Sequence, residues 1–171
     1  MIPVSNTRKA STLLALLASF ILGRPALAAD GITHIQTNES PIARLVTVPP
    51  GATTYYVSGM TPPVADASAP KDSIQAYGDT KTQTIGAITR IKDALAEQGL
   101  MLGDVVMMHV YLVGDPAKGG KMDFGGMMEG YKQFFGTPKQ PNKPARSTVQ
   151  VSALAAPGFL IEIEVIAARA K

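Results

Sequence analysis

Two segments near the C-terminus, residues 144–151 and 160–165, alternate apolar and polar side chains. Successive side chains of a β-strand point to opposite faces, so each segment is predicted to be a strand with one buried face. Glu162 and Glu164 then share a face opposite the isoleucines, and Arg146 stands at the start of the first strand. A guanidinium can bind a carboxylate through two parallel hydrogen bonds, and a carboxylate can accept a proton from water. The pair Arg146 and Glu162 therefore indicates a site for a small molecule that carries a carboxylate.

Residues 1–28 have the pattern of a secretory signal peptide. Arg8-Lys9 is a short basic start, 12–23 is an apolar run, and Ala26-Leu27-Ala28 is the small-x-small pattern that precedes cleavage. The apolar run is shorter than the roughly 20 residues that span a bilayer, so removal is favoured over a retained anchor. We expect an exported protein, periplasmic or secreted, without a membrane span once the signal is removed.

The remaining chain, 29–171, has the length of one domain. Three of the 16 Lys and Arg lie in the signal segment, which has no acid, so 13 basic residues remain against 13 acidic ones. This balance removes the electrostatic support for nucleic-acid binding. The chain has no cysteine, and His34 and His109 have no metal-ligand spacing. We therefore expect no disulfide, no metal and no cofactor.

The order along the chain is predicted as strand, strand, helix, strand, helix, strand, strand. Residues 45–48 and 54–58 read as two paired strands after a polar, irregular start, and 60–78 reads as a loop. The predicted helices are 79–98, from its three- and four-residue apolar spacing, and 124–135. The nearly continuous apolar run 105–113 predicts a central strand buried on both faces.

These elements predict an α+β fold, a mixed β-sheet with two helices packed on one face. The strands carry more apolar surface than two helices can cover. Burial of the other sheet face against further copies of the chain is the natural solution, and cyclic homo-oligomers are the common form.

The chain resembles the RidA (YjgF) family, from about Leu45 to Ala168. The most specific match is Pro-Ala-Arg-Ser-Thr-Val-Gln-Val at 144–151 with Ile-Glu-Ile-Glu at 161–164. Shorter matching pieces occur in the same order at compatible spacings: Ser58-Gly59, 91–99, 104–106, Asp123-Phe124, Tyr131 and Phe134-Phe135.

The resemblance implies a chorismate-mutase-like homotrimer with clefts between subunits. It also implies hydrolysis of reactive enamines and imines, of the 2-aminoacrylate type, to 2-keto acids and ammonia without a cofactor. Arg146 would bind the substrate carboxylate and Glu162 would position or activate the water. Backbone beside Thr148 and the Ser58-Gly59 segment would help to hold the substrate.

The sequence departs from the family pattern at several places. Thr148 and Met128 stand where many members carry cysteine and asparagine, and the family's Gly-Pro-Tyr stretch has no clear counterpart near 41–45. These departures leave two alternatives open. One is a trimer that binds small carboxylates without turnover, and the other is a protein-interaction trimer that does not need Arg146.

Several residues also have a purely structural interpretation. Tyr131, Phe134 and Phe135 are expected to belong to the helix core. His109, in the middle of an apolar strand, is expected to be a packed or interface histidine and not a base. Glu164 is expected to be a bystander or a partner across a subunit interface.

Overall fold

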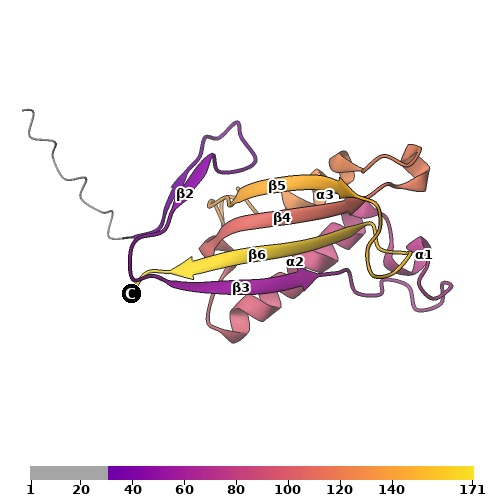
Figure 1. The fold of residues 1–171 in the computed structure, drawn as a ribbon, viewed down its shortest axis with the longest axis horizontal. Coiled ribbons are helices and arrows are strands. Elements are labelled where there is room, and N and C mark those ends of the chain that lie inside the picture. The colour runs from indigo at the N-terminus through magenta and orange to yellow at the C-terminus, as the bar shows by residue number, and fades with distance from the viewer. Residues whose placement is uncertain (1–30) are drawn as a thin grey trace, which may run out of the picture.

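The computed structural model describes residues 31–171, and the predicted signal peptide lies outside them. Its main feature is a four-stranded mixed sheet in the order β3-β6-β4-β5 (Figure 1). Strand β6 runs antiparallel to both of its neighbours, β3 and β4, whereas β5 runs parallel to β4. The strands are β3 (Thr53–Met60), β4 (Val105–Val113), β5 (Ala145–Val151) and β6 (Ile161–Arg169). The predicted α+β class with a mixed sheet is confirmed.

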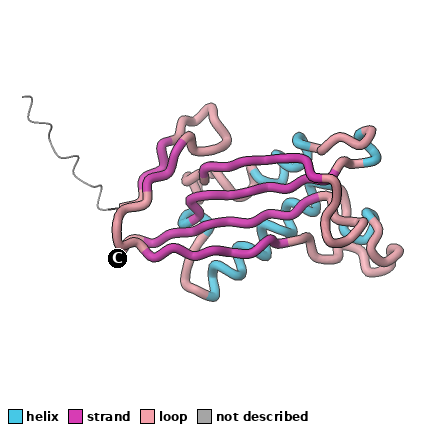
Figure 2. The backbone as a smooth tube through the Cα atoms, viewed as in Figure 1, coloured by secondary structure: helices cyan, strands magenta, loops and turns pink. Residues whose placement is uncertain are grey.

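Helices α2 (Thr80–Glu97) and α3 (Phe124–Tyr131) cover one face of this sheet, and no helix of residues 31–171 covers the other (Figures 1 and 2). The Asp79 side chain caps α2 by accepting a hydrogen bond from the Thr82 backbone N–H. Just after its end, Gly99 takes the positive φ of 68° that glycine adopts easily. Helix α3 is shorter than predicted, because residues after Tyr131 form turns.

The hydrophobic core lies between the helices and the inner side chains of β4 and β6. Val110, Leu112, Ile161 and Ile163 are fully buried there, as are Ile88, Ile91 and Leu95 of α2. Strand β4 was predicted to be buried on both faces, and within one chain this is wrong. Its alternate residues Met107, His109, Tyr111 and Val113 remain half-exposed, because they point to the face that no helix covers.

The predicted pairing of residues 45–48 with 54–58 is also wrong. Strand β2 (Leu45–Thr47) pairs with β1 (Thr33–Ile35), in a stretch expected to be irregular, and forms a separate two-stranded ribbon. Strand β3 pairs instead with β6, in a longer ladder. The inner side chains of β6 are apolar and buried. The physical reason is that three residues of β2 offer little apolar surface to β3.

Three short helical segments complete the chain. Helix α1 (Ile74–Tyr77) lies within the predicted loop 60–78, and 3-10 turns occupy Leu102–Asp104 and Pro116–Lys118. No helix within residues 31–171 is both long and apolar enough to cross a membrane.

The ribbon of β1 and β2 is clamped to the segment that leads into β5. The Lys143 ammonium donates to the carbonyls of Thr37 and Ser40, each at 2.8 Å. The Gln36 side chain accepts from the Lys143 backbone N–H at 2.8 Å and donates to the Pro141 carbonyl at 2.9 Å. Because Lys143 is buried, this clamp holds the start of β5 in place three residues before Arg146.

Candidate functional site, in two halves

Arg146 lies on the helix-covered face of β5, beside α3. Its guanidinium carbon is 4.4 Å from the centroid of the Tyr131 ring and 5.9 Å from that of Phe124. Its Nη2 atom is 3.1 Å from the Met128 sulfur, and Nη1 is 4.0 Å from the Met127 sulfur. A thioether is a weak hydrogen-bond acceptor, so these contacts leave the guanidinium donors largely unsatisfied.

No carboxylate within residues 31–171 forms an ion pair with Arg146. Burial lowers the pKa of the guanidinium, and the Tyr131 side chain opposes that shift. Arginine nevertheless keeps its charge in proteins, so a half-buried cation faces aromatic rings and thioethers without a negative partner. This arrangement suits an external anion, and a carboxylate matches the planar guanidinium best.

Two hydroxyl groups beside Arg146 are buried without a hydrogen-bond partner in the described chain. They belong to Thr148, two residues along the same face of β5, and to Tyr131, whose ring lies against the guanidinium. Burial raises the pKa of the Tyr131 phenol, which therefore stays neutral. An unpartnered buried hydroxyl costs about 1–3 kcal/mol, so such groups mark places where a ligand or water completes the structure.

Glu162 belongs to a second half-site, formed by β6 and β3. It points away from the buried Ile161 and Ile163, as the alternation predicts. A β-bulge between Val57 and Met60 shifts the register of β3 and brings Gly59 against Glu162. A Cβ atom on Gly59 would overlap the Glu162 carboxylate, so this close approach requires glycine.

Sequence reasoning missed a polar cluster next to this half-site. Glu164 Oε1 lies 2.9 Å from His109 Nδ1 and accepts a hydrogen bond from the Tyr111 hydroxyl at 3.1 Å. The hydrogen bond to Glu164 is the main cause that raises the pKa of Tyr111. Ser58 is exposed and shares an open hollow of about 210 Å³ with His109 and Glu164. The alternation of β4 could have shown that Tyr111 and His109 share a face.

The structure does not bring Arg146 and Glu162 together within one chain. Arg146 stands beside Met108, whose side chain is buried in the core, whereas Glu162 stands beside Tyr111 on the open face. Paired residues of neighbouring strands point to the same face, so the Arg146 and Glu162 side chains occupy opposite faces of the sheet. A site that uses both residues therefore needs a second copy of the chain.

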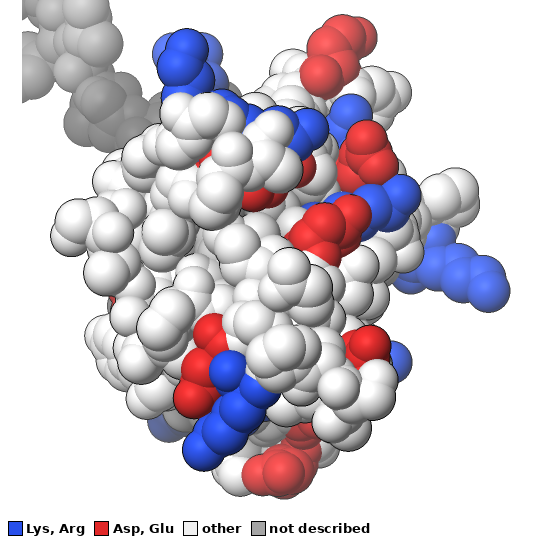
Figure 3. Space-filling view, turned by 90° about the vertical axis from the view of Figure 1, so that its right-hand side faces the viewer, with Lys and Arg blue, Asp and Glu red and all other residues white. Residues whose placement is uncertain are grey.

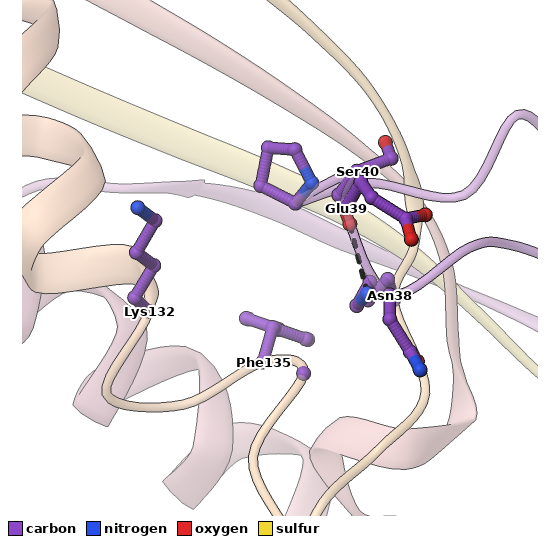
Figure 4. A pocket seen from close by; sticks show the side chains of 8 residues that line it. Asn38, Glu39, Ser40, Lys132 and Phe135 are labelled. Carbon is purple, nitrogen blue, oxygen red and sulfur yellow. Dashed lines mark hydrogen bonds between the residues drawn. The ribbon is translucent and has the colours of Figure 1, made fainter.

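A separate hollow of about 300 Å³ lies between the loop after β1 and the turns after α3 (Figure 4). Asn38, Glu39 and Ser40 line one side of it, and Lys132 and Phe135 lie across from them. None of the residues predicted for the site lines this hollow.

The charged side chains are mixed on the face shown in Figure 3, where acidic and basic groups alternate and neither sign forms a continuous patch. Within residues 31–171, no three His, Asp or Glu side chains lie together as metal ligands. The sheet order defines a class of small α+β protein whose mixed sheet is covered by helices on one face, with Arg146 on that face and Glu162 on the other.

The family model described as endoribonuclease L-PSP matches residues 37–169. The chain therefore belongs to that family, the family of the RidA (YjgF) proteins that its sequence resembles. A RutC family protein of Pyrococcus abyssi is 43% identical over 90 residues, which cover 53% of this chain and 62% of the relative.

Two solved structures extend the comparison. A Rid family protein from Yersinia pestis, at 22% identity, shares the fold with a TM-score of 0.58 over 80% of this chain and 97% of its own. TdcF of E. coli, solved with bound serine, is 29% identical with a TM-score of 0.52, over 80% of this chain and 98% of its own.

Proposed function

We propose that this protein is an enamine/imine deaminase that hydrolyses small 2-imino acids to 2-keto acids and ammonia. The observation that carries the proposal is the half-buried Arg146 guanidinium, which has no carboxylate partner within residues 31–171 and lies beside two unpartnered hydroxyls. The serine bound to the related TdcF is itself a small molecule with a carboxylate, which agrees with this assignment.

In the proposed reaction Arg146 binds the substrate carboxylate and so fixes the neighbouring C=N carbon. Glu162 of a second copy holds a water molecule and takes its proton as the oxygen adds to that carbon. Both protons of this water pass in turn through Glu162 to the nitrogen, the C=O bond forms as the C–N bond breaks, and ammonia and the 2-keto acid leave. Positioning of this kind can be worth several kcal/mol, and in this scheme Glu162 carries the protons.

We propose that the sites form between the subunits of a homotrimer. Support comes from the open sheet face, where Tyr56 is 79% exposed and Val149 is 46% exposed beside the half-exposed outer residues of β4. A second copy packed on this face would bury these apolar side chains. It would also supply the half-site that each chain lacks. We further propose that the protein is exported, on the strength of the N-terminal sequence pattern alone.

Ammonia release from 2-imino acids, generated in situ by an amino-acid oxidase, tests the proposal. The purified protein should accelerate release, and Arg146→Ala and Glu162→Gln should each remove the acceleration. Gln75→Ala, at an exposed position on α1, serves as the control that keeps full activity. If no imine in a broad set responds while 2-keto acids still bind, the protein is a binding module and the deaminase proposal fails. Cleavage of RNA, the activity in the family's description, is assayed in parallel with the same variants.

A further inference from the structure

We infer that the Arg146 half-site selects 2-imino and 2-oxo acids with an apolar side chain. This inference deepens the proposed function and rests on its assignment of Arg146 as the carboxylate anchor. It depends on which atoms surround the guanidinium in this chain, and above all on Met128.

The contacts of the guanidinium divide into a buried wall and an accessible rim. Tyr131 and Met127 are each 1% exposed and form the wall. Phe124, at 44% exposure, and the half-buried Met128 form the rim. A ligand that reaches Arg146 from solvent therefore passes between a phenyl ring and a thioether.

Met128 is the residue that a bound carboxylate must meet. Its sulfur lies 3.1 Å from Nη2, in the space that the second oxygen of a carboxylate would take in bidentate binding to Arg146. Binding displaces the sulfur, and the flexible methionine side chain then rests against the ligand. The carbon next to the carboxylate, together with its substituent, falls beside Met128 and Phe124.

These neighbours favour an apolar substituent. A buried methylene contributes about 0.8 kcal/mol, or roughly fourfold in affinity, so an isobutyl group in place of a methyl group should gain at least about tenfold. Among residues 31–171 the contacts of Arg146 are aromatic rings and thioethers, so a second carboxylate finds no cation among them. Its desolvation disfavours acidic substrates.

Titration calorimetry of the full-length protein with pyruvate, 4-methyl-2-oxopentanoate and 2-oxoglutarate tests the inference. The isobutyl compound should bind at least about tenfold more tightly than pyruvate, and 2-oxoglutarate more weakly than either. Met128→Gln should reduce the preference over pyruvate to about threefold or less, while Met128→Leu should retain the ratio. Phe124→Ser, at an exposed position, offers a second variant that does not disturb the core.

Equal binding of pyruvate and 4-methyl-2-oxopentanoate, or tighter binding of 2-oxoglutarate, overturns the inference. Rates of ammonia release from the corresponding imines separate it from the proposed function. Selective binding without ammonia release would contradict the deaminase proposal and support the inferred selectivity. Ammonia release with the same kcat/KM for all substrate side chains would contradict the inferred selectivity and support the deaminase proposal.

Discussion

Arg146 and Glu162 project from opposite faces of the same sheet, on strands β5 and β6, with β4 between them. Neither side chain has an ion-pair partner among residues 31–171. Under the proposed function, one chain therefore cannot apply both side chains to the same ligand.

This geometry predicts that two inactive variants restore activity when their subunits are mixed. Arg146→Ala lacks the carboxylate anchor, and Glu162→Gln lacks the base. In trimers reassembled from equal amounts of both, about a quarter of the clefts combine an intact Arg146 with an intact Glu162. Ammonia release should recover to about a quarter of the wild-type rate.

The controls are the two variants treated alone by the same dissociation and reassembly, which should stay inactive. A mixture that also stays inactive, although it contains mixed trimers by native mass spectrometry, would show that both residues act from one chain.

Gly59→Ala should impair activity more than stability. The added Cβ has no room beside the Glu162 carboxylate and displaces it from its place next to the bulge of β3. Misplacement of a catalytic group by about 1 Å can cost 10²-fold, so kcat should fall by at least about tenfold. Steady-state kinetics and the melting temperature are measured together.

Gly103→Ala is the matched control, because its added Cβ would make only ordinary contacts, 3.6 Å from the Gln140 side-chain oxygen. A Gly59→Ala protein with normal kcat would mean that the position of Glu162 does not matter for turnover.

Gln83→Ala should destabilise the protein strongly. The buried Gln83 side chain donates to the carbonyls of Gly78 and Gly158, each at 2.9 Å, and accepts from the Leu160 N–H at 2.7 Å. Its loss leaves three backbone groups without this partner, two of them buried and one partly buried, so the free energy of unfolding should fall by about 3 kcal/mol in urea titrations. Gln75→Ala, at an exposed position, should change it by less than about 0.5 kcal/mol.

The cap of α2 should make stability fall in acid. The backbone hydrogen bond from Thr82 is the main cause that lowers the pKa of Asp79 below its ordinary 3.8. Because the folded pKa is the lower one, the stabilisation is complete above 3.8 and is lost as the pH falls through the folded value. Asp79→Ala should cost about 1 kcal/mol at pH 7.

Asp79→Asn separates the charge from the cap, since asparagine caps a helix but does not titrate. Its stability relative to wild type should improve as the pH falls from 5 to 3, as followed by urea unfolding. A difference between these two proteins that is independent of pH would contradict this account.

Local patterns in the sequence predict the separate elements well. The spacing of Ile88, Ile91 and Leu95 identifies α2, and the alternation around Glu162 identifies the inner and outer sides of β6. The strand at β2 is predicted, whereas β1 and its pairing with β2 are not, because three residues are too few to show a period.

The order and register of the strands in the sheet could not be predicted from these patterns. Alternation shows which residues of one strand share a face, but not whether Arg146 and Glu162 point to the same side of a sheet. That depends on strand order and register, which follow from contacts distant in sequence. The contact between Arg146 and Met128 depends in the same way on how α3 packs against β5.

The place of β6 within the sheet also governs how the chain can fold. It is the last strand in sequence, yet it lies between β3 and β4 and supplies the only strand that β3 pairs with in the described chain. Closing the sheet therefore joins segments more than 100 residues apart, and contacts of this kind slow folding. During synthesis β3 stays without this partner until β6 has left the ribosome. A chain truncated before Ile161 would lack β6, and β3 and β4 would then have no strand between them.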